Sequence, residues 1–508
     1  MNLPVPSLAA TAWAQNRSSG VLMPIFSLPS AYGIGDLGQH AYQFAERLAQ
    51  ADQRFWQILP LNPTNAGAGE SPYFSSSAFA GNPLLIDLEG LAADGYLNID
   101  ELEVPEGLSQ GTVDFERVRP FKLNALRQAA SKFIELADFG DFYAFEEAQK
   151  HWLDDYALFS ELERQYPGIS WCEWPSPIRD RDPETLASLK DEHAAAILET
   201  KIFQYFFFRQ WQALKAYCNQ LGLLVFGDMP IYVSYDSADV WANQSIFKLG
   251  DDRRPTMVSG VPPDYFSATG QLWNNPVYNW EALKADNYRW WVERMAGLFA
   301  IYDIVRIDHF RGLVQFWEVP AGSETAIHGS WQDVPTYDFF DTLIKANPAF
   351  PVVAEDLGII TPDVVEVKNH YALPGMLVLH FAFFDDNDDN PYKPENHSEL
   401  ALTYLGTHDN NTTAGWFDEV DDSAKQRLAG YLANKPVETP SFMELALESK
   451  ANITILTVQD LLGLSGRARI NNPSTAWGNW RWQLTADEFN AIPMDWLKDA
   501  TKSHNRCH

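Results

Sequence analysis

Residues 303–312 read Asp303-Ile-Val-Arg-Ile-Asp-His-Phe-Arg-Gly312, and this stretch decides the fold that the sequence predicts. Its isoleucines and valine form a compact apolar run, as a strand buried on both faces requires. Charged residues and a glycine then end the run. A buried strand that carries an acid between two arginines at its carboxyl end is typical of an active site at the mouth of a parallel barrel. Taken alone, the stretch also fits a structural Arg–Asp pair.

The same pattern recurs along the chain. Short apolar runs, most of them preceded by helical patterning, occur at residues 21–26, 55–61, 223–228, 303–308, 351–356, 376–381, 401–409 and 453–458. They predict a (β/α)₈ TIM barrel forming a single catalytic domain over residues 1–508. Residues 84–199 and 229–287 lack this alternation of apolar runs and helical segments. We expect them to be large, mainly helical insertions after strands two and three, the second lining the cleft, and we expect no C-terminal β-sandwich domain.

Composition restricts the partners. The chain has 508 residues and a formal net charge of −31, with 37 Lys and Arg against 68 Asp and Glu. Nucleic acid and anionic membrane surfaces require a basic footprint, so neither is expected as a partner. Aromatic residues are abundant (18 Trp, 20 Tyr and 31 Phe), and many lie in Gly-, Pro- and Asn-rich loops such as residues 271–278. Aromatic faces in polar loops suit sugar rings, which have apolar C–H faces.

Cysteine usage and the N-terminus bear on location. Cys172, Cys218 and Cys507 lie far apart, which argues against a disulfide framework and for a reducing compartment. Residues 1–6 show no basic segment leading into an apolar one, so no signal peptide is expected. No run approaches the roughly 18 apolar residues of a membrane span. We expect a cytoplasmic protein that is a monomer or a homodimer.

One motif is rejected. Gly33, Gly35 and Gly38 satisfy G-x-G-x-x-G, the pattern of a dinucleotide-binding loop. A loop separates these glycines from the preceding strand, and Phe-Trp-Gln stands near residue 55 instead of a strand-end acid for a ribose. We therefore expect no dinucleotide and no other cofactor.

Ionisable residues stand at the ends of the predicted strands: Asp228, Asp308, Glu355, His408 and Asp409. Because all strand ends of a parallel barrel face one side, these side chains are expected to converge on one cleft. Several carboxylates without a cysteine or a metal-binding motif indicate glycosidic bond exchange. In its retaining form, one carboxylate attacks the anomeric carbon while a carboxyl group about 5–5.5 Å away protonates the departing oxygen.

Asp308 and Glu355 lie on neighbouring predicted strands, so this separation is accessible. Arg306 precedes Asp308 by two residues on the same face, and its charge would keep Asp308 ionised as a nucleophile. The apolar strand before Glu355 and the neighbouring Asp356 would raise the pKa of Glu355, as a proton donor requires.

His408 and Asp409 can hold sugar hydroxyls through charge-assisted hydrogen bonds and distort the sugar ring. A metal site is the rival chemistry, because His309, His380 and His408 could join the acids in binding Zn²⁺ or Mg²⁺. The sequence has no HExxH or comparable ligand spacing, so no metal is expected. P-loop and G-x-S-x-G motifs are absent as well.

Ordered runs through nearly the whole chain carry a family resemblance: Tyr32–Gly38, Ser71–Tyr73, Ser77–Pro83, Gly227–Ile231, Asp236–Trp241, Gly260–Trp273, Arg306–Gly312, Ala354–Gly358, Thr407–Asn410 and Gly478–Trp480. They resemble the 4-α-glucanotransferases known as amylomaltases or disproportionating enzymes, glycoside hydrolase family 77 of the α-amylase clan. The resemblance implies transfer of α-1,4-glucan segments from a maltooligosaccharide or starch donor to the 4-OH of another glucan or of glucose. It also implies a covalent glycosyl-enzyme and cyclic glucans as side products.

The resemblance implies roles for particular residues. Asp308 is the nucleophile, Glu355 the acid/base, and Asp409 the acid that stabilises the transition state. Tyr73 belongs to a flexible loop that covers the glucan. The substrate-binding residues that it implies are Tyr73, Ser71, Asp228, Gln271, Trp273, Arg306, His309, His408 and Asn471.

Two positions depart from the family pattern. Asn274 and Ser474 stand where glycines usually follow the Gln-Leu-Trp and Asn-x-Pro runs. Both are expected in loops, where they bear on acceptor preference and chain length and not on the reaction. An α-glucan hydrolase of the α-amylase clan is the alternative enzyme. A catalytically silent glucan-binding protein is the other alternative, although it predicts loss of an acid and all three acids are present.

Overall fold

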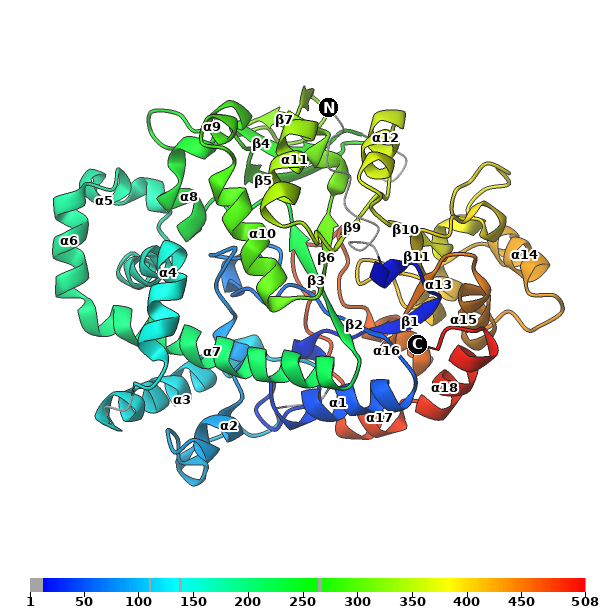
Figure 1. The fold of residues 1–508 in the computed structure, drawn as a ribbon, viewed down its shortest axis with the longest axis horizontal. Helices are drawn as coiled ribbons and strands as arrows, with labels where there is room; N and C mark the ends of the chain where they lie inside the picture. The colour runs from blue at the N-terminus through cyan, green and yellow to red at the C-terminus, as the bar shows by residue number, and fades with distance from the viewer. Residues whose placement is uncertain (1–11, 109–110, 137–138, 264–266, 508) are drawn as a thin grey trace.

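The computed structural model describes residues 12–108, 111–136, 139–263 and 267–507. Its centre is an eight-stranded parallel sheet with the order β10-β11-β12-β1-β2-β3-β6-β9 (Figure 1). At the seam, the N–H of Ala354, the last residue of β9, donates to the carbonyl of Pro374 before β10 at 2.9 Å, which nearly closes the barrel. The predicted (β/α)₈ barrel is confirmed. Its strands are β1 (Ser18–Leu22), β2 (Phe55–Gln57), β3 (Leu224–Pro230), β6 (Ile304–Asp308), β9 (Val352–Ala354), β10 (Gly375–Val378), β11 (Ala401–Tyr404) and β12 (Ile453–Thr457).

Two expectations fall partly outside the described residues. Residues 1–11, which include the segment inspected for a signal peptide, are not described, and neither are residues 264–266 of the run that ends at Trp273.

Helices cover the outside of the barrel between most strands. Because helices bury the outer face of the strands and the barrel interior buries the inner face, most of the strands are short and largely apolar. Residues 379–400, all of them described, contain only the 3₁₀ turns η9 (Leu379–Phe383) and η10 (Pro394–Asn396), so β10 and β11 are joined without an α-helix. The covering helices are α1 (Gln39–Gln50), α7 (Ala194–Gln220), α10 (Arg289–Ile301), α11 (Thr336–Ala346), α12 (Pro362–His370), α13 (Thr413–Glu419), α14 (Asp422–Tyr431) and α15 (Thr439–Glu448).

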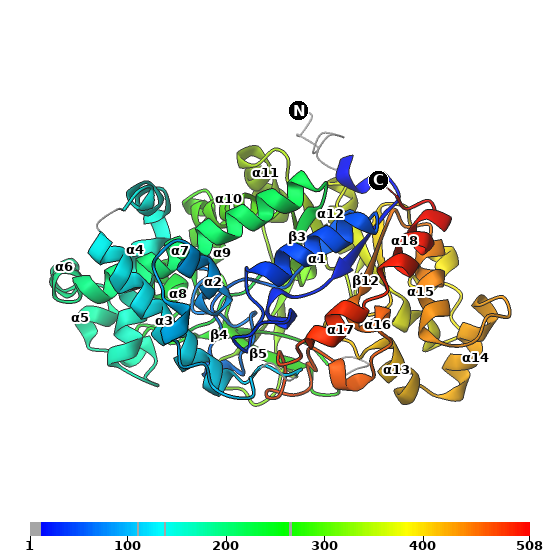
Figure 2. The ribbon, with the colours of Figure 1, turned by 90° about the horizontal axis from the view of Figure 1, so that it is seen from below.

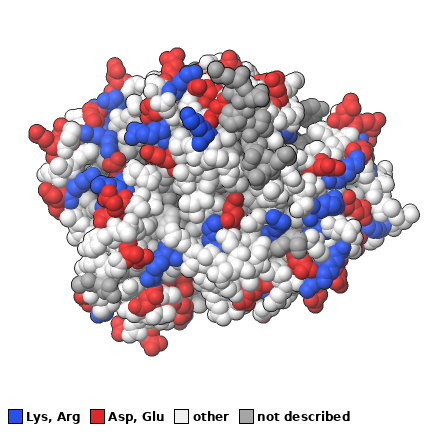
Figure 3. Space-filling view, viewed as in Figure 1, with Lys and Arg blue, Asp and Glu red and all other residues white. Residues whose placement is uncertain are grey.

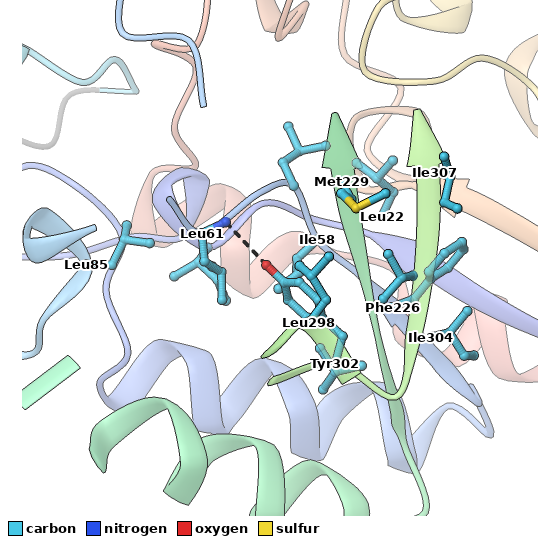
Figure 4. Packing of buried hydrophobic residues seen from close by; sticks show 14 of the residues in the cluster. Leu22, Ile58, Leu61, Leu85, Phe226, Met229, Leu298, Tyr302, Ile304 and Ile307 are labelled. Carbon is cyan, nitrogen blue, oxygen red and sulfur yellow. Dashed lines mark hydrogen bonds between the residues drawn. The ribbon is translucent and has the colours of Figure 1, made fainter. Parts of the chain in front are cut away.

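The packing around β3 shows how tightly strand and helix meet (Figure 4). Tyr302 follows helix α10 and lays its ring against Gly227, where an added Cβ would come within 2.3 Å of the ring. The hydroxyl of Tyr302 accepts the N–H of Leu61 at 3.3 Å, which ties the loop after β2 to this contact. Any side chain at position 227 would therefore displace Tyr302 and the strand beneath the cleft.

The first insertion is helical, as predicted for residues 84–199. It forms the cyan lobe at the left of Figure 1 and leads into the long helix α7. The aromatic stripe of α7 is buried, as expected for a core helix: Phe203, Phe206, Phe207 and Trp211. The helices of the insertion are α2 (Leu88–Ala93), α3 (Phe115–Leu136), α4 (Phe142–Gln165), α5 (Ser176–Arg179) and α6 (Pro183–Glu192).

The second insertion, residues 229–287, is not mainly helical, and this prediction was wrong. Besides α8 (Ala238–Ala242) and α9 (Trp280–Ala285), it contains β4 (Met257–Val261) and β5 (Gln271–Pro276). These strands pair with β7 (Gln315–Pro320) and β8 (Ser330–Asp333), which come after β6, in an antiparallel sheet of order β5-β4-β7-β8. The partner strands lie beyond a barrel strand in the sequence, so local patterning does not reveal the pairing.

The C-terminal part packs on the barrel as helices, and the described residues after β12 form no β-sandwich. Figure 2 shows α17 (Ala486–Ala491) and α18 (Met494–Ser503) on the same side as α1, and α18 packs against α1 and α15. The short helix α16 is Val458–Leu461. Arg506 is fully buried and donates to the carbonyls of Ser18, which begins β1, and of Asn452, which precedes β12, so it fastens the chain end to the barrel.

The surface shown in Figure 3 carries Asp and Glu interspersed with Lys and Arg, without a broad basic area on that face. Within the described ranges, no helix combines the length and the apolar character that crossing a membrane requires.

Candidate active site

The register of three adjacent strands brings the predicted acids together. Asp228 of β3 lies opposite Arg306 of β6, and Pro230 lies opposite Asp308. Because side chains alternate along a strand, Arg306 and Asp308 share one face. The guanidinium of Arg306 donates through Nη1 to Asp228 Oδ2 at 2.6 Å, and its Nη2 is ion-paired with Asp308 Oδ1 at 2.7 Å. The side chain of Arg306 is only 3% exposed, so one buried cation holds two carboxylates at the mouth of the barrel.

Glu355 follows β9 and lies against the residue after Asp308. The backbone N–H of His309 donates to Glu355 Oε2 at 2.7 Å, and that of Leu357 donates to Oε1 at 3.0 Å. His309 reaches this position with a left-handed φ of 55°, which is uncommon for a residue other than glycine. Strain of this kind persists where the surroundings impose it, as at active sites.

Burial changes the protonation of both acids. It raises the pKa of Glu355 to about 7, with the neighbouring Asp356 contributing in the same direction, as expected. Burial also raises the pKa of Asp308, to about 8, although Arg306 acts to lower it. Burial thus opposes the expectation that the charge of Arg306 keeps Asp308 ionised, and so do the carboxyl groups of Asp228, Glu355 and Asp409, which act to raise the pKa of Asp308. The two acids compete for a proton.

His408, Asp409 and Tyr73 complete the cluster. The Tyr73 hydroxyl donates to Asp228 Oδ2 at 2.7 Å, and its ring stacks on that of His408 with centroids 5.3 Å apart. The single hydroxyl proton is used on Asp228, so Nε2 of His408 is the donor in the second contact, at 2.8 Å. Asp409 Oδ1 lies 3.4 Å from the same nitrogen and accepts from Asn471 Nδ2 at 2.6 Å. Burial lowers the pKa of His408, so its ring stays neutral near pH 7.

The remaining predicted binding residues reach the cluster through neighbours. The ring of Trp273 meets the ring of His309 edge-on at 4.7 Å, and its Nε1 donates to Gln271 Oε1 at 3.2 Å. The Oγ of Ser71 accepts the N–H of Tyr73 at 3.3 Å. Ser71 therefore shapes the turn that presents Tyr73, and Gln271 orients Trp273.

One departure from the family pattern has a structural explanation. Asn274 lies inside β5 and not in a loop, which corrects that expectation, and its φ is 62°. Glycine adopts this conformation freely, and asparagine is the residue that tolerates it next best. The backbone therefore keeps the shape that a glycine would give it.

Two contributors were missed. Arg469 Nη2 donates to the carbonyl of Asp409 at 2.8 Å, and the ring of Trp480 lies 5.6 Å from that of Tyr73. Trp480 stands in the Gly478–Trp480 run that supported the resemblance, and this run was the available signal.

The rival metal site receives no support in the described part of the chain, where no three His, Cys, Asp or Glu side chains lie together as metal ligands would. His380 stacks on Trp416 at 4.9 Å, and its Nε2 lies 3.1 Å from the hydroxyl of Thr413. It is thus part of the packing beneath the cleft.

A parallel barrel whose strand ends converge on ion-paired and buried carboxyl groups defines a class of enzymes that act on glycosidic bonds. The family model described as 4-alpha-glucanotransferase (glycoside hydrolase family 77) matches residues 23–488. The chain belongs to this 4-alpha-glucanotransferase family and is an enzyme of that kind.

Similar proteins support this membership along the whole chain. A 4-alpha-glucanotransferase of Synechocystis sp. is 46% identical over 490 residues, which cover 95% of each chain. One of Thermus thermophilus is 43% identical and covers 93% of this chain and 96% of its own. The amylomaltase of Streptococcus agalactiae, solved in complex with acarbose, superimposes with a TM-score of 0.93 at 36% identity, covering 97% of this chain and 100% of that one.

Proposed function

We propose that this enzyme is a retaining 4-α-glucanotransferase that moves α-1,4-glucan segments through a covalent glycosyl-enzyme on Asp308. The observation that carries the proposal is a pair of carboxyl groups with raised pKa values that share a proton near neutral pH: Asp308, which is ion-paired to Arg306 at 2.7 Å, and Glu355, which is buried. An ionised acid beside a protonated one is the arrangement that a retaining mechanism needs.

We assign the shared proton to Glu355. Asp308 has a guanidinium in contact and a side chain that is 31% exposed to solvent, and both favour its anion. Among the described residues, no Lys, Arg or His side chain forms an ion pair with Glu355. Glu355 is therefore the better place for a proton that must be given to the leaving oxygen.

In the first half-reaction, a carboxylate oxygen of Asp308 attacks the anomeric carbon of the donor. The bond to the glycosidic oxygen breaks, and Glu355 gives its proton to that oxygen, so a shortened glucan leaves with a new 4-OH. Asp409, held by Asn471 at 2.6 Å, and neutral His408 bind sugar hydroxyls and favour the oxocarbenium-like transition state.

In the second half-reaction, Glu355 is ionised and takes the proton of an acceptor 4-OH. The acceptor oxygen attacks the anomeric carbon, and the bond to Asp308 breaks with retention of configuration. When the acceptor is the far end of the bound segment itself, the same step yields a cyclic glucan. Tyr73 lies over this space with its hydroxyl on Asp228, and a cover of this kind favours a sugar hydroxyl over water.

Asp356 is the other carboxyl group considered as proton donor. Its Oδ1 accepts the backbone N–H of Met376 at 2.7 Å, and its Oδ2 is ion-paired with Lys368. Both oxygens are thus engaged at the β9–β10 seam, which favours Glu355 for the role.

The test is incubation of the purified protein with maltotriose, without added metal, followed by chromatography of the products. Longer maltooligosaccharides together with released glucose are expected. Maltose and glucose alone would establish the hydrolase instead. If no maltooligosaccharide is converted, the proposed activity is refuted and the protein is a glucan-binding protein. Asp308→Asn is expected to remove nearly all turnover in a folded protein, and activity within about tenfold of wild type would overturn the assignment of the nucleophile.

A further inference from the structure

Residues 471–480, here called the 471–480 loop, touch the catalytic cluster at both ends. At the first end, Asn471 holds the carboxylate of Asp409. At the other end, the ring of Trp480 lies 5.6 Å from the ring of Tyr73 and 6.0 Å from that of His408. Trp480 therefore packs against the stacked rings of Tyr73 and His408.

The backbone at Trp480 is strained. Its φ is 65°, a left-handed value that bulky residues rarely adopt, and its side chain is buried. The N–H of Trp480 donates to the carbonyl of Ile470 at 2.8 Å. A bulky residue keeps such a conformation only where its surroundings impose it, and strain of this kind concentrates at functional sites. The strained turn aims the indole at the cluster.

The loop is stiffened from within. The Oδ1 of Asn479 accepts the N–H of Asn472 at 2.9 Å, and its Nδ2 donates to the carbonyl of Thr475 at 2.8 Å. These bonds hold the two arms of the loop together, so Asn471 and Trp480 keep a fixed spacing.

The helical insertion holds the far side of Trp480. The N–H of Val113 donates to the carbonyl of Arg481 at 2.7 Å, and the guanidinium of Arg481 forms an ion pair with Glu116 of α3 at 2.6 Å. The residue after Trp480 is thus fastened to the 84–199 insertion, while the first residue of the loop, Asn471, is fastened to Asp409.

We propose that Trp480 is a positioning residue for the transfer reaction, and that the 84–199 insertion acts on the cleft through Arg481 and Trp480. Trp480 holds Tyr73 and His408 in the geometry in which the Tyr73 hydroxyl joins Asp228 to His408. Displacement of a catalytic group by about 1 Å can lower the rate by about 100-fold. This inference rests on the proposed function, because its readout is transfer between maltooligosaccharides.

The experiment compares Trp480→Leu with wild type by steady-state disproportionation of maltotriose. We expect kcat to fall about 10- to 100-fold while KM changes less than about threefold, because Trp480 acts through its neighbours and not on the bound sugar. Trp480→Phe keeps an aromatic ring and is expected to recover most of the loss. Trp496→Leu, which removes a partly buried indole of α18, is the matched control and is expected to leave kcat unchanged.

The decisive measurement is a double-mutant cycle with Tyr73→Ala. If Trp480 acts through Tyr73, Trp480→Leu costs at least threefold less in the Tyr73→Ala background than in wild type. Losses that simply multiply would overturn the inference, as would full kcat in Trp480→Leu. If Trp480→Leu does not fold, the same cycle is run with Trp480→Phe and read in the same way. An inactive wild-type enzyme would instead refute the proposed function.

Discussion

Arg306 is the most informative single residue to change, because it forms ion pairs with both Asp228 and Asp308 at the centre of the cleft. Arg306→Met keeps a long side chain but removes the guanidinium. It leaves Asp228 and Asp308 without the cation that now lies 2.6 and 2.7 Å from them. The variant is expected to lose both stability and activity.

The magnitude follows from burial. Arg306 is 3% exposed, and removal of one partner of a buried pair costs about 3–5 kcal/mol because the other charge stays behind unpaired. With an unfolding entropy of about 2.1 cal/mol/K per residue, a chain of this length loses roughly 1 °C of Tm per kcal/mol. A decrease in Tm of about 3–5 °C is expected at pH 8. Turnover should fall by at least about 100-fold, as for loss of a preorganised electrostatic contact.

The sign of the pH dependence is fixed by the raised pKa values. The folded pKa values of Asp308 and Glu355, about 8 and about 7, lie above those of an unfolded chain, so the folded state takes up protons as the pH falls. Arg306 lowers both, and its removal raises them further. The stability deficit of Arg306→Met is therefore largest above pH 8 and shrinks toward pH 5, where Asp308 and Glu355 are neutral and need no cation.

The assay is thermal unfolding of wild type and variant at pH 5, 6.5 and 8, with maltotriose disproportionation measured at pH 7. Arg254→Met is the matched control, because Arg254 pairs with Glu173 at 2.7 Å on the open surface and its removal should leave Tm unchanged. A deficit in Arg306→Met that is the same at pH 5 and pH 8, or activity within tenfold of wild type, would refute the electrostatic account of the cleft.

Further outcomes are expected at Glu355, Asn274 and Arg506. Turnover of maltotriose should fall as the pH rises above 7, where Glu355 loses its proton. Glu355→Gln should lower the turnover of maltotriose about 10²–10⁴-fold but still form the glycosyl-enzyme from a maltosyl fluoride, because the fluoride leaving group needs no acid. Equal losses of activity with both donors would place the acid elsewhere. At Asn274, with its φ of 62°, Val should cost about 1–2 kcal/mol in urea unfolding while Gly costs nothing, and a Val variant as stable as wild type would contradict the backbone argument. Arg506→Met removes five hydrogen bonds to buried carbonyls and should lower stability by at least about 3 kcal/mol, with unchanged specific activity of the folded enzyme.

The barrel and the acids of its cleft could be predicted from the sequence alone. Most barrel strands are short and largely apolar because helices cover their outer face and the barrel interior encloses their inner face. Parallel strands place their carboxyl ends on one side, so Asp228, Asp308, Glu355 and Asp409 had to converge whatever lay between them. The strand register then placed Asp228 opposite Arg306, so that the two side chains could pair.

Other features were decided by tertiary structure. Tyr73 meets His408 across 335 residues, and β4 pairs with β7 across the barrel strand β6. The sixth barrel strand, β10, ends earlier than its apolar pattern suggested and is followed by the 3₁₀ segment η9. His380 therefore packs against Trp416 and does not lie among the acids. Nothing in the local sequence specifies such contacts, because they form between segments that only the completed barrel brings together.

Trp480 shows the same division most clearly. The sequence supplied a Gly-Asn-Trp run, but Trp480 keeps its left-handed φ of 65° because its N–H donates to the carbonyl of Ile470 on one side and Arg481 is anchored to the insertion on the other. A local pattern specifies what a single element buries and where it ends. The orientation of side chains between elements depends on which non-local contacts hold each backbone in place. For this reason the acids could be located from the sequence, whereas the residues that orient them were placed only by the tertiary structure.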